Sequence, residues 1–183
     1  LKNYTDEGSP GRDWNVATGM VIEGKAGFQI MGDWAKGEFK AAGKTPGVDY
    51  YCTSTPSNNG YLYNVDSFIF YKTSDPDKQA GQKLLAKLMM GKNFQKVFNL
   101  YKGSIPARLD VSMDEFDQCA KTSNADIKTA GASGGLVPSF AHGMAQGNTM
   151  KAALQDVITE HFNSSMSSND AANALADSVL QNM

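Results

Sequence analysis

The chain has 183 residues, of which 41% are hydrophobic and 20% are charged, and its formal net charge is −2. This composition excludes wholesale disorder, and the length allows one domain or two small lobes with a buried core. The slightly acidic balance gives no reason to expect nucleic acid or an anionic membrane as a partner, and no apolar run approaches the ~18 residues of a membrane-spanning helix.

The N-terminal segment, residues 1–11, has neither an initiator methionine nor the basic, apolar and small-residue regions of a signal peptide. We therefore expect the chain to be a piece of a longer protein. Apolar residues at helical spacing then predict a helix over 13–22, which Gly24 ends.

The segment 24–39 is the most informative part of the chain. A short apolar run over 26–31 predicts a buried strand, and Asp33 is expected to be the N-cap of a helix that begins at Trp34. Trp34 would then lie at the carboxyl end of a strand, where open α/β sheets bind ligands, and an indole there suits stacking on a sugar ring. The same pattern fits a core tryptophan at the edge of a sheet.

Two further strand regions are expected before the middle of the chain. Residues 48–52 predict a second strand, and 57–60 have the composition of a turn or linker. Aromatic and β-branched residues alternate over 61–71, which predicts one or two strands. Asp66 lies inside this run, where an unpaired carboxylate would be costly, so we expect it to be hydrogen-bonded, to cap a turn or to face a cleft.

The second half of the chain is predicted to be mainly helical. A proline with nearby acids marks a helix start at 74–77, and another helix is expected from Asn93. Residues 102–108 form an irregular connection, because Pro106 biases Ile105 towards extended geometry. The remaining expected helices are 111–121, 124–130, 146–162 and 168–182. Early strands and late helices predict an α/β fold with a helical C-terminus.

Few residues carry a chemical signature. His142 follows a proline at a loop-to-helix junction and is a structural residue or a ligand-binding one, and Lys102 is a solvated surface charge or faces a cleft. Cys52 and Cys119 match no CxxC pattern, and are free buried thiols or a disulfide of an oxidising compartment. Motifs of metal sites, nucleophile elbows and phosphate-binding loops are missing from the sequence, which favours binding over catalysis and predicts no metal and no cofactor.

Seven segments share their order and spacing with one known family: 12–18, 24–28, 31–39, 64–67, 93–98, 102–106 and 138–142. Together they resemble the C-terminal half of carbohydrate-binding proteins of bacterial ABC importers, the glucose/mannose-type members of the type II periplasmic-binding fold. The resemblance covers essentially the whole chain. Any one segment is weak evidence, whereas their common order is specific.

The resemblance implies a lobe for each part of the chain. Residues 1–57 would be the first part of the C-terminal lobe, 58–105 would belong to the N-terminal lobe, and 106–183 would be the helical remainder of the C-terminal lobe. It also implies a disulfide between Cys52 and Cys119 and a periplasmic, extracytoplasmic location. The missing N-terminal half would supply the other wall of the cleft, and without it the strands of this chain would lose their neighbours.

The resemblance implies a function as the solute-binding component of a sugar importer. A glucose-like monosaccharide would be bound in the interlobe cleft and presented to the membrane permease, with no catalysis. Trp34 would stack on the sugar, Lys102 and His142 would donate hydrogen bonds to ring hydroxyls, and Asp66 would accept one. The alternatives are an extracytoplasmic glycoside-active hydrolase, for which Asp33 and Asp66 are the candidate carboxylates, and a structural surface domain.

Overall fold

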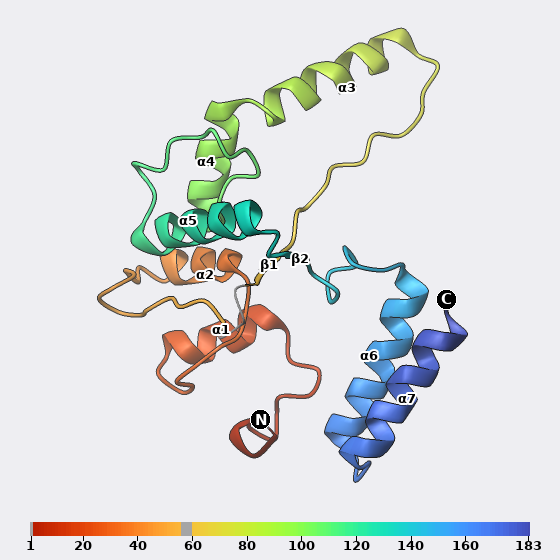
Figure 1. Cartoon of the computed structure of the whole chain (residues 1–183). Helices are drawn as coiled ribbons and strands as arrows, with labels where there is room; N and C mark the ends of the chain where they lie inside the picture. The colour runs from red at the N-terminus through yellow and green to blue at the C-terminus, as the bar shows by residue number, and fades with distance from the viewer. Residues whose placement is uncertain (1, 56–59) are drawn as a thin grey trace. The chain divides into compact units, whose positions relative to one another are not determined.

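The computed structural model describes residues 2–55 and 60–183, which fall into two compact units (Figure 1). We call residues 8–55 and 65–134 the disulfide unit, and residues 2–7, 60–64 and 135–183 the helical-hairpin unit. Most of the turn or linker expected at 57–60 lies outside the described residues.

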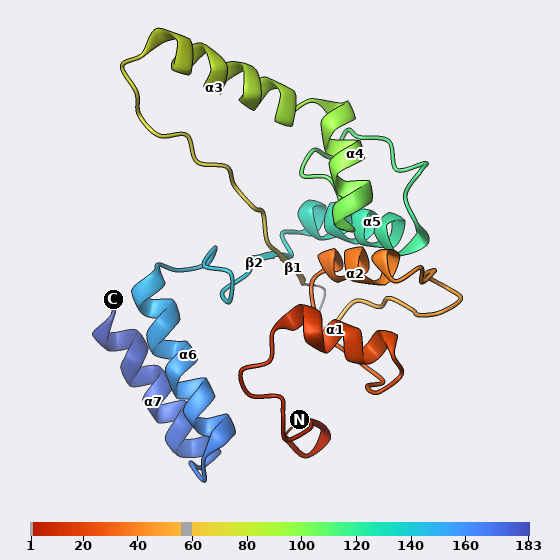
Figure 2. The same ribbon diagram turned by 180° about the vertical axis from the view of Figure 1, so that it is seen from behind.

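The helical-hairpin unit contains two short strands and a pair of long helices. Its elements are η1 (Lys2–Tyr4), β1 (Tyr61–Tyr63), β2 (Leu136–Pro138), α6 (Asn148–Asn163) and α7 (Ser168–Gln181). The strands pair in parallel, with Tyr61 opposite Leu136. Helices α6 and α7 run side by side in both views (Figures 1 and 2) and bury Met150 and Ala171. The two helices confirm the expectations for 146–162 and 168–182.

The disulfide unit is mainly helical. Its elements are α1 (Trp14–Ile22), η2 (Asp33–Ala35), α2 (Lys36–Ala41), α3 (Pro76–Met89), α4 (Lys92–Lys102) and α5 (Gln118–Ser133). Helix α2 packs against both α1 and α4. The disulfide between Cys52 and Cys119, with a Cα–Cα distance of 5.7 Å, joins the loop after α2 to the first turn of α5 and confirms the expected pairing.

Local sequence signals set the ends of the helices in this unit. Asp75 caps α3 by accepting hydrogen bonds from the backbone N–H groups of Asp77 and Lys78, with Pro76 at the first helical position. Helix α4 ends at Gly103, whose φ of +93° is a left-handed conformation that glycine adopts without strain. The helix expected over 13–22, the helix start expected at 74–77 and the helix expected from Asn93 are confirmed.

The strands expected at 26–31 and 48–52 are wrong. Residues 26–31 have no regular structure, and Phe28 and Ile30 are 96% and 74% exposed. In the second segment Tyr50 makes only an isolated bridge to Pro46. A strand needs a neighbour for its backbone N–H and C=O groups, and β1 and β2 are the only strands among the described residues.

Two other boundaries differ from expectation. Within 61–71 only Tyr61–Tyr63 forms a strand, and the remaining residues are irregular. The helices expected at 111–121 and 124–130 are one helix, α5, which begins only at Gln118 because Asp117 caps it. Its interior tolerates Gly131, and it ends at Gly134, where φ is +72°.

Candidate functional site

Trp34 lies in η2, immediately before helix α2, and its indole is half-buried. The ring rests directly on the backbone of Gly32. A Cβ atom built on Gly32 would lie 2.1 Å from Cζ3 of Trp34, a distance that no side chain could occupy. The glycine is therefore required at this turn for the indole to lie where it does.

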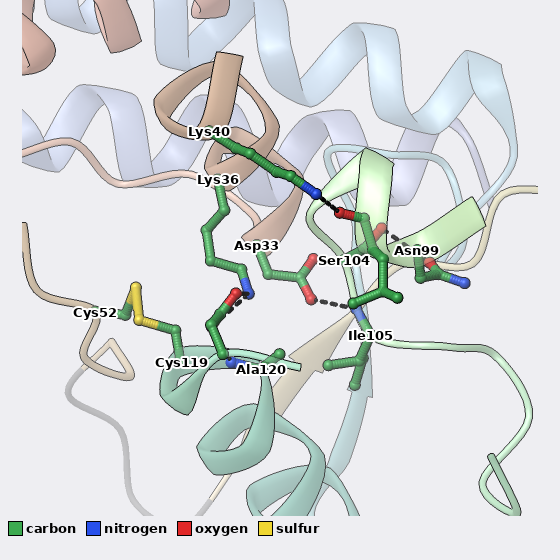
Figure 3. A network of polar contacts seen from close by, with 11 residues as sticks. Asp33, Lys36, Lys40, Cys52, Asn99, Ser104, Ile105, Cys119 and Ala120 are labelled. Atoms are coloured by element: carbon green, nitrogen blue, oxygen red, sulfur yellow. Dashed lines mark hydrogen bonds and ion pairs between the residues drawn. A yellow bond between two sulfur atoms is a disulfide. The ribbon is translucent and has the colours of Figure 1, made fainter. Parts of the chain in front are cut away.

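Asp33 does not cap helix α2 through its side chain, so that expectation is wrong. Figure 3 shows its carboxylate directed instead at Ile105, whose backbone N–H donates to Oδ2 at 2.8 Å. Burial raises the pKa of Asp33, although the hydrogen bond from Ile105 and the charges of Lys36 and Lys102 oppose this shift. The side chain thus links the Trp34 turn to the connection that follows α4.

The first turn of α2 and the end of α4 approach so closely that no side chain fits between them. A Cβ atom on Gly37 would lie 2.8 Å from the backbone oxygen of Lys102, and one on Gly103 would lie 2.6 Å from the backbone nitrogen of Gly37. Lys40 reinforces the contact by donating from Nζ to the backbone oxygen of Leu100 at 2.7 Å (Figure 3). Two glycines therefore set the distance between the helices.

Lys102, the last residue of α4, forms an ion pair with Asp66. The Lys102 side chain is 30% exposed and that of Asp66 is 64% exposed, so the pair faces solvent. Nζ of Lys102 also lies 5.8 Å from the ring centroid of Phe98. The expectation that Asp66 is hydrogen-bonded is confirmed, and Lys102 is paired rather than an isolated surface charge.

A second ion pair, between Lys36 and Asp117, belongs to the same unit. Nζ of Lys36 is 3.0 and 2.9 Å from the two carboxylate oxygens of Asp117, and its side chain is only 8% exposed. Asp117 also accepts the backbone N–H of Ala120 at 2.8 Å and so caps α5. This pair was not among the predicted functional residues. The one signal for it in the sequence is an aspartate immediately before a helix.

A pocket of about 190 Å³ in the disulfide unit is lined by none of the predicted sugar contacts. Among the residues that line it are Lys36, Tyr50 and Asp117. Tyr50 stacks on Phe39 with ring centroids 4.1 Å apart. Burial, with a smaller contribution from the charge of Asp117, raises the pKa of Tyr50 to about 12.

His142 belongs to the helical-hairpin unit and is exposed. Its Nδ1 lies 2.7 Å from the hydroxyl oxygen of Ser139, which is 2% exposed. That oxygen also accepts the backbone N–H of His142 at 3.4 Å. Ser139 thus fixes the orientation of the imidazole through Nδ1, and the tautomer of the ring decides whether Nδ1 donates or accepts in this hydrogen bond.

The structure brings three of the four predicted sugar contacts into one unit. Trp34, Lys102 and Asp66 all belong to the disulfide unit, and the Asp33–Ile105 hydrogen bond joins the Trp34 turn to the residues after Lys102. His142 is in the other unit, where Ser139 holds it.

Over the described residues, no group of three or more His, Cys, Asp and Glu side chains is placed to hold a metal ion. Nor does any helix in that part of the chain have the length and apolarity needed to cross a membrane.

Comparison with known proteins gives consistent matches. The model of the family described as "Bacterial extracellular solute-binding protein" matches residues 1–129. The chain is 47% identical over 180 residues to a "Probable sugar-binding periplasmic protein" of Brucella suis, covering 98% of this chain and 42% of the relative. It is 44% identical over 180 residues to the protein of the same name from Rhizobium meliloti, covering 98% and 43%.

A more distant relative is a "Xylose/arabinose-binding protein" of Haloferax volcanii, which is 26% identical over 183 residues and for which the coverage is 97% of this chain and 38% of the relative. The chain thus spans about two fifths of the length of these curated relatives.

Proposed function

The chain belongs to the bacterial extracellular solute-binding proteins, and from that membership we propose that the whole protein is the sugar-binding component of an ABC importer. The family confirms the resemblance, the α/β periplasmic-binding fold and the extracytoplasmic location that the sequence predicts. The partial coverage of the relatives agrees with the expectation that the chain is part of a longer protein. The permease and the remaining half of the protein are the proposed macromolecular partners.

The proposed ligand is a glucose-like monosaccharide held between two lobes. The observation that best supports a sugar is the ion pair of Lys102 and Asp66 beside the Trp34 turn. A sugar hydroxyl both donates and accepts hydrogen bonds, so an ammonium next to a carboxylate can satisfy both roles of adjacent hydroxyls. The indole of Trp34 would supply the apolar contact that the face of a pyranose ring needs.

His142 would add a second donor from its imidazole ring, whose orientation Ser139 fixes through Nδ1. On sugar binding the lobes would close about a hinge, and the closed form would be the one that the permease recognises. The lobe boundaries at 57 and 105 remain part of this proposal.

The hydrolase alternative has less support. It requires two carboxylates flanking a sugar, and the candidates were Asp33 and Asp66. Asp33 is committed to the backbone N–H of Ile105, and Asp66 is paired with Lys102. Membership of a solute-binding family further supports binding without catalysis.

Calorimetry on the full-length protein tests the proposal. The panel is glucose, mannose, galactose, xylose, arabinose and maltose; the two pentoses are included because one relative is named a xylose/arabinose-binding protein. Replacing Lys102 or His142 by Ala should cost about 1.5–3 kcal/mol, or one to two decades in Kd, and Trp34→Ala at least as much. The matched controls are Lys83→Ala on α3 and His161→Ala on α6, which should bind as wild type.

An assay for hydrolysis of aryl glycosides runs beside it and should show no turnover. Unchanged sugar affinity in both the Lys102 and His142 variants would remove these residues from the site. Turnover that is lost on replacing Asp33 or Asp66 would favour the hydrolase instead.

A further inference from the structure

Resting on the proposed sugar site, we infer that Asp33 is a positioning residue that fixes the Trp34 turn to the Lys102 turn, so that the stacking surface and the charged donor keep one separation. Nothing in the family description or in the names of the relatives assigns a role to this residue.

The hydrogen bond of Asp33 joins two segments that are far apart in sequence. Asp33 precedes Trp34 directly, and its acceptor oxygen binds the backbone N–H of Ile105, three residues after Lys102. A single side chain therefore connects the backbone that carries the indole to the backbone that carries the ammonium group (Figure 3).

The neighbouring helix contact cannot do this alone. Gly37 and Gly103 bring α2 and α4 together as bare backbone, which sets how closely the helices approach. Lys40 of α2 also donates a hydrogen bond to the backbone oxygen of Leu100 in α4, but this contact, like that of the glycines, is made by α2 and not by the turn that carries Trp34. The Trp34 turn therefore needs a restraint of its own. The directed hydrogen bond from Ile105 to Asp33 supplies that restraint.

The buried surroundings of the Asp33 carboxylate also favour a positioning role over a role for its charge. Burial opposes the charge on Asp33, and the charged groups that act on it, Lys36 of α2 and Lys102 of α4, do not overcome that effect, so its pKa is raised. The position therefore gains little from the charge. What it requires is an oxygen acceptor of this length, which asparagine also offers.

Substitution at this one position separates positioning from charge. In the full-length protein, Asp33→Asn keeps the acceptor and should bind glucose within about threefold of wild type. Asp33→Glu keeps the charge but moves the acceptor by one methylene, and Asp33→Ala removes it; each should weaken glucose binding by about tenfold, roughly the loss of one well-placed hydrogen bond. Asp33→Glu serves if the alanine variant does not fold.

The control is Asp75→Ala, which also removes a carboxylate that accepts backbone N–H groups, but at the start of α3. It should lose comparable stability and keep wild-type affinity. A double-mutant cycle with Lys102→Ala adds a readout that a merely structural role would not change. In the Lys102→Ala background, Asp33→Ala should weaken glucose binding by about threefold instead of tenfold, because only the Trp34 contact can still be misplaced.

The outcomes are distinct. The Ile105 amide proton should shift with the titration of Asp33 in NMR spectra of the wild type and lose that shift in Asp33→Ala, whether or not sugar is present. Folded Asp33→Ala and Asp33→Glu that bind glucose like wild type would overturn the positioning role and leave the proposed function standing. A wild-type protein that binds no sugar in the panel would overturn the proposed function itself.

Discussion

Removing Lys36 and removing Asp117, the two partners of the buried ion pair, should lower the free energy of unfolding by very different amounts. Asp117→Ala removes the cap of α5, worth about 1 kcal/mol, and leaves an ammonium group unpaired on a side chain that is 8% exposed. Breaking a fully buried pair costs 3–5 kcal/mol. Because Asp117 is 35% exposed, breaking this pair should cost less, about 2–3 kcal/mol. With the loss of the cap, Asp117→Ala should lower the free energy of unfolding by about 3–4 kcal/mol.

Lys36→Met should cost much less. Methionine keeps the apolar stem of the lysine and removes the buried charge, while Asp117 retains solvent and the N–H of Ala120. We therefore expect a loss of about 1 kcal/mol or less. The control is Lys25→Met, whose ion pair with Glu23 is 68% and 57% exposed and should be worth less than about 0.5 kcal/mol.

Urea unfolding followed by tryptophan fluorescence measures these changes. Both tryptophans of the sequence, Trp14 and Trp34, are in the disulfide unit, so the signal reports on the unit that contains the ion pair. Equal losses for Lys36→Met and Asp117→Ala would refute the reasoning, because they would mean that the pair acts as an interchangeable contact and not as a buried charge that needs its partner.

Three further predictions concern the same unit. Gly32→Ala must displace the indole of Trp34, which a Cβ would meet at 2.1 Å, so the unit should lose about 1–3 kcal/mol and its Trp34 emission should shift; an unchanged spectrum would contradict this. Reducing the disulfide, which spans a sequence separation of 67, should lower the free energy of unfolding by about 4 kcal/mol, checked by urea midpoints with and without dithiothreitol. Burial raises the pKa of Tyr50 to about 12 from the ordinary 10.0, so the stability present below pH 10 should fall as the pH rises from 10 through 12, and stability curves of Tyr50→Phe should lack that contribution.

The helices of this chain could be predicted because their signals are local. The Asp75–Pro76 start of α3 and the left-handed Gly103 at the end of α4 act within a few residues of the ends they define. The helix expected over 111–121 starts late, at Gln118, because Asp117 caps it and is held by Lys36, which lies on a helix that is distant in sequence.

Part of the candidate site could likewise be predicted from local sequence signals, and part could not. The sequence could nominate Trp34 and Lys102 through their turns and through the resemblance to a family. It held no signal for the contact that joins them, because a hydrogen bond between Asp33 and Ile105 leaves no periodicity and no motif. Asp33 was predicted to be a helix cap, a role that its place before Trp34 favours and that its burial against Ile105 replaces.

The failed strands have a different cause: the described residues provide no neighbouring strands for 26–31 and 48–52. Phe28 and Ile30 are exposed here, although burying such a side chain fully is worth about 1.5–3 kcal/mol. A strand pattern specifies one face for the core and two edges for neighbouring strands, and the partners need not come from nearby residues. The relatives are more than twice as long as the stretch that this chain matches. An apolar run such as 26–31 therefore has the pattern of a buried strand, but the described residues provide no neighbouring strands for it. A helix makes its backbone hydrogen bonds internally, so it forms without such neighbours.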